Sequence, residues 1–204
     1  MESKTEDNIL LAAEQEFLNK GYMRTTMADI ANKASVNHAL LHYYYRNKEN
    51  LFIKVFEKNI KNITTLMYSL IDNSVPFLER VQKFIEIHFD YIAQNPKLPF
   101  FIVNEILANK ICVAILQKQL QPIVNEITKQ LDKEIRKEYE LGHINYITVE
   151  NLIYEIISLN ICSFVLMPVS TQLLNVTEKE YLQFVEQRRT ENVVTILNRL
   201  TKTI

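Results

Sequence analysis

The sequence predicts an all-α fold, and three observations support this. Hydrophobic residues make up 48% of the 204 positions, so the chain can bury a large core. Glycine occurs only at Gly21 and Gly142, which argues against a turn-rich β fold and excludes glycine-rich phosphate loops. The five prolines are far enough apart to leave long segments with apolar residues at helical spacing: Pro76, Pro96, Pro99, Pro122 and Pro168.

The first two helices have recognisable ends. Apolar residues on one face define the first helix: Ile9, Leu10, Ala13 and Phe17. This pattern stops at Gly21, which suits the position just after a helix C-terminus. Thr26 and Asp29 form a capping-box pattern, in which each side chain bonds the other's backbone N–H, so a second helix begins there and runs to about Ala34.

A short polar break at residues 35–37 predicts a helix-turn-helix over about residues 26–45. Asn37 is a good N-cap for a third helix at residues 38–44. Ala31 is small enough for the two helices to cross closely, over a small apolar core of Ile30, Val36, Leu41 and Tyr44. The residues left on the outer face of the third helix are Asn37, His38, Ala39, His42 and Tyr43. Such a helix fits the DNA major groove, and Thr25 and Thr26 would then lie beside a phosphate.

The charge distribution is compatible with this reading. Residues 20–48 contain five basic side chains and one acidic one, so their net charge is +4. The remaining residues sum to −5, because the whole chain has a net charge of −1. A basic segment on an acidic body is typical of a local polyanion site.

Longer helices are expected in the rest of the chain. Their approximate ranges are 48–60, 77–95, a helix after Pro99, 111–139 with a kink at Pro122, 148–167 and 177–200. No repeat or low-complexity linker separates them. We therefore expect two domains in continuous helical structure, residues 3–63 and residues 64–204.

The N-terminal residues resemble the TetR-type family of transcriptional regulators from about Ser3 to Ile63. The matching positions are Ile9, Leu10, Ala13, Phe17, Gly21, Tyr22, Thr25, Thr26, Met27, Ile30 and Ala31, followed by Tyr44, Tyr45, Lys48, Glu49 and Leu51. The resemblance implies base contacts from Asn37, His38 and Ala39. It also implies contacts to the DNA backbone from Thr26, the neighbourhood of Leu40, His42, Tyr43 and Lys48.

Three positions depart from the family pattern. Ser35 stands where the family usually has glycine, so we expect a non-glycine residue in an unfavourable backbone region. Leu40 replaces a small polar residue and offers only an apolar contact, such as one to a thymine methyl group. His42 replaces tyrosine, and a phosphate contact from it would strengthen on protonation of the imidazole.

The last two helices are apolar on more sides than one chain can cover. The resemblance implies that they pair with their copies in a homodimer, which then meets two half-sites of a palindromic operator. The expected interface residues are Ile153, Ile157, Ile161, Phe184, Val194 and Leu197.

The resemblance also implies that the C-terminal domain binds a small, largely apolar effector. Residues that could line its pocket are His88, Phe89, Ile92, Phe100, Phe101, Asn104, Leu116, Tyr154 and Phe164. Ordinary core packing is the simpler explanation for any one of them, and for His88 in particular.

Other classes of site have little support. His38 and His42 are one helical turn apart, but no carboxylate accompanies them, so we expect no metal and no cofactor. No nucleophile–base pair stands out, and Cys112 and Cys162 are expected to be buried thiols, so an enzyme is not indicated. The most apolar segment, residues 152–169, contains Glu155 and Asn160 and predicts a buried helix rather than a membrane span. With no signal-peptide pattern at the N-terminus, we expect a cytoplasmic protein.

The combined prediction is a regulator that binds double-stranded DNA and responds to a ligand, more often a repressor than an activator in this family. The alternative is a helical module for small molecules that has lost operator reading. Ser35 and Leu40 are the residues that leave this alternative open.

Overall fold

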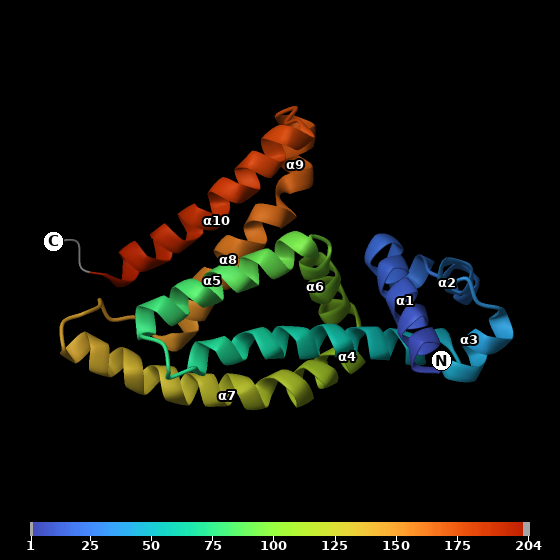
Figure 1. The fold of residues 1–204 in the computed structure, drawn as a ribbon, viewed down its shortest axis with the longest axis horizontal. Helices are drawn as coiled ribbons and strands as arrows, with labels where there is room; N and C mark the ends of the chain where they lie inside the picture. The colour runs from blue at the N-terminus through green and yellow to red at the C-terminus, as the bar shows by residue number, and fades with distance from the viewer. Residues whose placement is uncertain (1, 202–204) are drawn as a thin grey trace. The chain divides into compact units, whose positions relative to one another are not determined.

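The computed structural model describes residues 2–201, and the side chains of these residues except at positions 2, 3, 167 and 168. All regular elements in this part of the chain are helices (Figure 1), which confirms the all-α prediction. In chain order they are α1 (Glu2–Arg24), α2 (Met27–Ala34), α3 (His38–Tyr44), α4 (Lys48–Met67), the 3-10 helix η1 (Tyr68–Ile71), α5 (Phe77–Gln94), α6 (Leu98–Ala108), α7 (Lys110–Glu140), α8 (Val149–Val165), α9 (Met167–Leu173) and α10 (Glu178–Leu200).

The chain forms two compact units. The first contains Met1–Asn62 and Phe100–Gln119, and the second contains Ile63–Pro99 and Leu120–Ile204. The first unit therefore ends close to the boundary expected at residue 63, and it also includes most of α6 and the beginning of α7.

Aromatic packing holds the first unit together. The ring of Phe17 on α1 meets that of Phe52 on α4 edge to face, with 5.4 Å between the ring centroids. Phe101 on α6 approaches Phe52 in the same way at 5.9 Å. Polar side chains reinforce this packing, since Glu14 on α1 accepts hydrogen bonds from Lys58 and Asn59 on α4, each at 2.7 Å.

The turn between α2 and α3 requires an unusual backbone conformation. Ser35 has φ 54° and ψ 41°, the left-handed region that favours glycine. In this conformation its N–H bonds the carbonyl of Asn32 at 3.1 Å, and the N–H of Val36 bonds the carbonyl of Ala31 at 3.0 Å. The expectation of an unfavourable backbone region at Ser35 is therefore confirmed.

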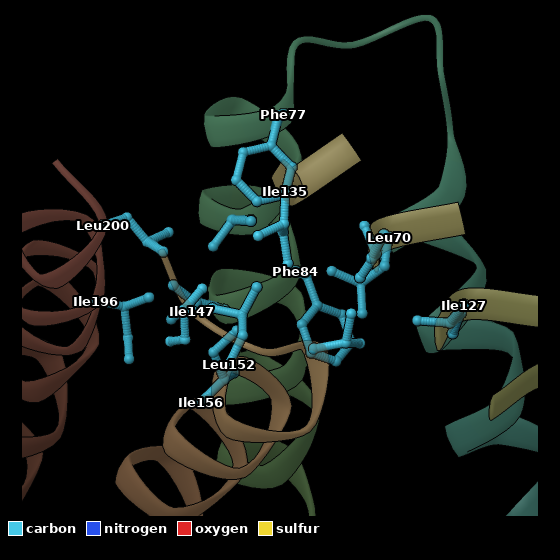
Figure 2. Close-up of a cluster of buried hydrophobic side chains, with 14 of the residues drawn as sticks. Leu70, Phe77, Phe84, Ile127, Ile135, Ile147, Leu152, Ile156, Ile196 and Leu200 are labelled. Atoms are coloured by element: carbon cyan, nitrogen blue, oxygen red, sulfur yellow. The ribbon is translucent and has the colours of Figure 1, made fainter. Parts of the chain in front are cut away.

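The second unit has one large apolar core. Side chains from η1, α5, α7, α8 and α10 meet there, and Phe84 and Leu152 lie near its centre (Figure 2). α5, α8 and α10 pack against one another, so each contributes one apolar stripe. A pair between Arg189 on α10 and Asp90 on α5, with N–O distances of 2.7 and 2.9 Å, joins two of these helices at the edge of the core.

A chain of hydrogen bonds crosses the second unit between these three helices. Asn160 on α8 is fully buried and donates to the carbonyl of Ile85 at 2.9 Å and to Nδ1 of His88 at 3.0 Å, both on α5. Its carbonyl accepts a 2.9 Å bond from Asn192 on α10, whose own carbonyl accepts one from Arg188 at 2.6 Å. Burial lowers the pKa of His88 to about 4. His88 is therefore a neutral core residue stacked on Phe84, with 5.6 Å between the ring centroids.

Two details differ from the sequence prediction. η1 and α9 were not anticipated, because each is short and lacks an apolar period of its own. Cys162 is exposed on α8, so its predicted burial was wrong, whereas Cys112 is buried.

We expect Ser35→Gly to raise stability by roughly 1 kcal/mol, because glycine adopts positive φ without the clash of a Cβ atom. Thermal unfolding followed by circular dichroism would show this as a rise of about 2–4 °C in Tm. Asn32→Gly is the matched control, since the same residue placed inside α2 should lower stability by a few tenths of a kcal/mol. Equal losses in both variants would contradict the strain at Ser35.

We expect the stability of the protein to fall as the pH drops from about 6.5 towards 4. In this range the imidazole of His88 binds a proton in the unfolded state but stays neutral in the folded state, so protonation favours unfolding. The contribution of His88 at about pH 5 is a loss of roughly 2 kcal/mol relative to neutral pH. Urea unfolding of the wild type and of His88→Gln at both pH values measures it, and the variant should show a smaller decrease. His38→Gln, which changes an exposed imidazole, should retain the wild-type decrease. An undiminished decrease in His88→Gln would exclude His88 as the source.

Candidate nucleic-acid interface

The segment that joins α1 to α2 is held from inside the protein. Gly21 has φ 77°, so the helical backbone is broken at the predicted position. Thr25 is buried, and its hydroxyl donates to the carbonyls of Gly21 at 2.9 Å and Glu16 at 3.2 Å. Its side chain is therefore turned away from solvent. The sequence had predicted that this side chain would lie beside a phosphate.

Thr26 begins α2 as predicted. Its hydroxyl accepts from the N–H of Asp29 at 3.1 Å, and the Asp29 carboxylate accepts from the backbone N–H of Thr26 at 2.9 Å. The Thr26 hydroxyl also donates to this carboxylate at 2.7 Å. These bonds from Thr26, followed by the contact with Lys20, lower the pKa of Asp29 to about 2. Both the hydroxyl proton and the backbone N–H of Thr26 are therefore already used within the protein.

α3 presents a polar face to solvent and an apolar one to the protein. Leu41 is fully buried and Leu40 is half-buried, whereas the other residues predicted to bind DNA on this helix or at its start are exposed: Asn37, His38, Ala39, His42 and Tyr43. Asn37 caps the helix, and its Oδ1 accepts the N–H of Leu40 at 2.7 Å. Its Nδ2 group is the part of the side chain that this cap does not use.

His38 and His42 lie side by side on α3, with 5.7 Å between their ring centroids. Nδ1 of His42 is 3.1 Å from the carbonyl oxygen of Arg46, and only a protonated nitrogen can bond an oxygen that has no hydrogen to donate. The hydrogen is therefore on Nδ1 in the neutral ring, and Nε2 becomes a donor when the ring is protonated.

Lys48 is half-buried at the start of α4. Its ammonium group donates to the backbone carbonyls of Tyr22 and Thr25, each at 3.0 Å. It also lies 4.3 Å from the centroid of the Tyr22 ring. The group predicted to contact the DNA backbone is thus directed at the protein.

The tyrosine that completes the core of the helix-turn-helix is Tyr45. The sequence had placed Tyr44 there, but Tyr44 is half-buried and Tyr45 is 6% exposed. Tyr45 follows α3 with an extended backbone, which rotates its side chain inward relative to the helical period. Its hydroxyl donates to Glu6 at 3.4 Å, and burial followed by the charge of Glu6 raises the pKa of Tyr45 to about 12.

Three exposed cations accompany this face in the first unit. They are Arg24 at the end of α1, Lys33 in the last turn of α2 and Arg46 after α3. All three belong to the basic segment of residues 20–48, in which the sequence predicted no particular contact for them. Because phosphate contacts depend mainly on exposed cations, they are candidates that charge alone had already indicated.

The residues proposed for an effector pocket fall in both units. Four of them belong to the first unit: Phe100, Phe101, Asn104 and Leu116. The other five belong to the second: His88, Phe89, Ile92, Tyr154 and Phe164. Within the second unit Phe89, Ile92 and Phe164 form a small buried cluster, whereas Tyr154 is 74% exposed on α8.

The residues proposed for a dimer interface lie at the surface of the second unit or close to it. Phe184 and Val194 on α10 are about half exposed, and Leu197 is half-buried. Ile153, Ile157 and Ile161 on α8 are also half-buried. α8 and α10 expose further apolar side chains near them, including Tyr154 and Leu182.

The described residues also bear on metal sites and on membrane-spanning helices. Within them, no group of three or more His, Cys, Asp or Glu side chains is arranged to hold a metal ion. No single described helix has the length and apolar character needed to cross a membrane. α6 and α7 meet that standard only as a pair, and the pair is bent by 115°.

Comparison with known proteins identifies the N-terminal module. Residues 9–55 match the family model described as "Bacterial regulatory proteins, tetR family". The HTH-type transcriptional regulator YhgD of Bacillus subtilis (strain 168) is 25% identical over 129 residues, which are 63% of this chain and 68% of YhgD. The HTH-type transcriptional activator FasR of Mycolicibacterium smegmatis (strain ATCC 700084 / mc(2)155) is 25% identical over 87 residues, or 43% of this chain and 40% of FasR. The chain thus spans less than half of FasR.

The fold is shared over the whole chain with solved structures. A mutant of HlyIIR, a hemolysin II transcriptional regulator, matches with a TM-score of 0.66 and 21% identity over 100% of both chains. These relatives are regulators of transcription rather than enzymes. Residues 9–55 therefore match the DNA-binding module of TetR-type transcriptional regulators, and the chain as a whole has the fold of solved regulators of that type.

Proposed function

We propose that this protein is a ligand-responsive repressor that binds a palindromic operator as a homodimer. The observation that carries the proposal is the exposed face of α3, which begins at Asn37 and is braced from behind by the buried Leu41. A helix with a free polar face and a fixed apolar one fits the width of the major groove. Repression is the simpler outcome of such binding, because a protein that occupies a promoter blocks it without a further surface for another protein.

Base recognition is assigned to Asn37, His38 and Ala39 at the first turn of α3. Since Oδ1 of Asn37 accepts the Leu40 N–H, its Nδ2 is free to donate to an acceptor on a base edge, such as O6 of guanine or O4 of thymine. Ala39 offers a methyl group that suits contact with the methyl group of thymine.

Contacts to the DNA backbone are assigned to the other end of α3 and to the start of α2. Tyr43 is 75% exposed and carries a hydroxyl donor, and His42 is exposed beside it. Thr26 would contribute as the N-cap that orders the first turn of α2, where the helix dipole favours an anion. The half-buried Leu40 would support these contacts from the apolar side.

The homodimer is assigned to α8 and α10. Apolar side chains exposed on adjacent helices of one unit are unfavourable in water, and a second copy would cover them. The members proposed for this contact are Ile153, Ile157, Ile161, Phe184, Val194 and Leu197. Two copies would then present two α3 helices to half-sites about 34 Å apart or somewhat further.

The effector is proposed to be small and largely apolar. The second unit contains a cavity of about 270 Å³ between the end of α4, α7 and α8, with mainly apolar lining residues such as Val124, Ile127 and Ile157. Tyr154, one of the residues proposed for the pocket, also lines it. Ligand binding near α8 would reach the proposed dimer contact directly, and it would thereby alter the spacing of the two α3 helices.

We expect Asn37→Ser to relax sequence preference at one base pair, with little loss of helix stability. Serine retains the N-cap but lacks the amide donor, so loss of this single hydrogen bond should reduce discrimination at that base pair by about 2–10-fold. Selection of duplexes from a randomised library by wild type and variant measures this preference.

Tyr43→Phe is the companion variant for backbone contact. It should weaken binding to all duplexes by about 2–10-fold and leave the preference unchanged, because a phosphate hydroxyl contact carries no sequence information. Unaltered preference in Asn37→Ser together with altered preference in Tyr43→Phe would overturn these roles.

We expect the double variant Phe184→Glu with Val194→Glu to be monomeric and to bind its operator at least tenfold more weakly. Two buried carboxylates per copy would oppose the proposed contact. Sedimentation equilibrium reports the mass. Leu141→Glu, another exposed apolar residue of the same unit but outside α8 and α10, is the matched control and should remain dimeric. A dimeric double variant would refute the assignment of this surface.

A further inference from the structure

We infer that Lys48 is a positioning residue of the helix-turn-helix. Its ammonium group joins the two ends of this motif and does not bind a phosphate. The inference rests on the proposed function, because it concerns how α3 is held for DNA binding. It reassigns the one lysine of this region whose ammonium group is directed at backbone carbonyls of the protein.

The ammonium group of Lys48 makes three contacts within the first unit. It donates to the carbonyls of Tyr22 and Thr25 at 3.0 Å, a normal hydrogen-bond distance. Its Nζ also lies 4.3 Å from the centroid of the Tyr22 ring, which is a cation–π contact. A lysine has three donors, so a phosphate would have to compete with these contacts.

The position of Lys48 in its own helix supports this reading. It is the first residue of α4, where a positive charge is unfavourable because the N-terminal end of a helix is itself positive. The side chain places that charge at the carbonyl end of α1, where the last turn leaves backbone oxygens without helical partners. The backbone carbonyls at the end of α1 thus stabilise the charge of Lys48, whereas α4 does not.

The carbonyls that Lys48 binds belong to a segment fixed by several side chains. The Thr25 hydroxyl bonds the carbonyl of Gly21 at 2.9 Å, and Arg24 bonds the carbonyl of Lys20 at 2.9 Å. The carboxylate of Glu105 accepts the backbone N–H of Tyr22, and the ring of Tyr22 packs on Phe52 with 4.7 Å between the centroids. Movement of this segment would therefore disturb several contacts together.

The consequence for DNA reading follows from chain order. Thr25 directly precedes Thr26, the N-cap of α2, and Lys48 comes four residues after the end of α3 at Tyr44. The bond from Lys48 to Thr25 therefore closes the chain between the start of α2 and the end of α3. With this closure intact, the angle at which α3 leaves the protein is fixed before DNA arrives.

The test compares Lys48→Met, which keeps the aliphatic stem and loses all donors, with Lys48→Gln, which keeps two N–H donors without the charge. The probe is a fluorescent duplex that the wild-type protein selects from a randomised library. Thermal unfolding gives Tm, and fluorescence anisotropy at several salt concentrations gives the slope of log K against log salt. Binding is measured at a temperature at which every variant is folded by circular dichroism.

We expect Lys48→Met to lower Tm by about 3–8 °C and to weaken DNA binding with an unchanged salt slope. Lys48→Gln should recover about half of the lost Tm, because its amide can still bond the two carbonyls. Lys33→Met is the matched control, since it removes the same charge from an exposed lysine on α2 and should keep the wild-type Tm.

A salt slope smaller by about one in Lys48→Met overturns the inference, because that loss is the signature of one phosphate contact. A wild-type Tm in Lys48→Met overturns it as well. Should Lys48→Met not fold, the slope of Lys48→Gln decides in the same way. A wild-type protein that selects no duplex would refute the proposed function, whereas the Tm comparison would still test the closure by Lys48.

Discussion

α3 has only seven residues, about two turns, and a helix of that length does not persist in water without support. Four residues of the helix-turn-helix support α3. Leu41 anchors its buried side, and Asn37 satisfies an N–H of its first turn. Ser35 adopts positive φ so that α2 and α3 can cross, and Tyr45 closes the far end by turning inward. The polar face that remains in solvent is therefore fixed in shape, and a rigid face loses less entropy on binding DNA than a flexible one.

The second unit is held by a different device. Its core is largely apolar, and a chain of hydrogen bonds through Asn160 joins α5, α8 and α10. A buried amide is costly unless its donors and acceptor are all bonded, and here each one has a partner. Sliding α10 along α8 would break the bond between Asn192 and Asn160 and leave the buried carbonyl of Asn160 without a partner. The surface that α8 and α10 share is therefore well defined, although its apolar side chains remain in solvent in a single chain.

Local signals in the sequence were enough for most helix ends. The break at Gly21, the capping box at Thr26 and the N-cap at Asn37 each depend on neighbours within three or four residues, and the structure confirms all three. What sequence could not give were contacts between distant segments. The inward turn of Thr25 and the direction of the Lys48 ammonium group depend on residues 9 and 23 positions away in the chain. Helical spacing also predicted Tyr44 for the core and missed Tyr45, because the helix stops between them and the period no longer applies.

The double duty of Asn37 limits how this protein's DNA preference can evolve. The residue both starts α3 and faces the groove, so a substitution there must still be able to begin a helix. Few side chains besides serine, threonine and aspartate meet that demand, and none of them carries an amide. His38 and Ala39 stand outside this restriction, because their side chains do not cap the helix. New operator preferences are therefore more accessible through substitutions at positions 38 and 39, whereas position 37 should accept only the few residues that can cap a helix.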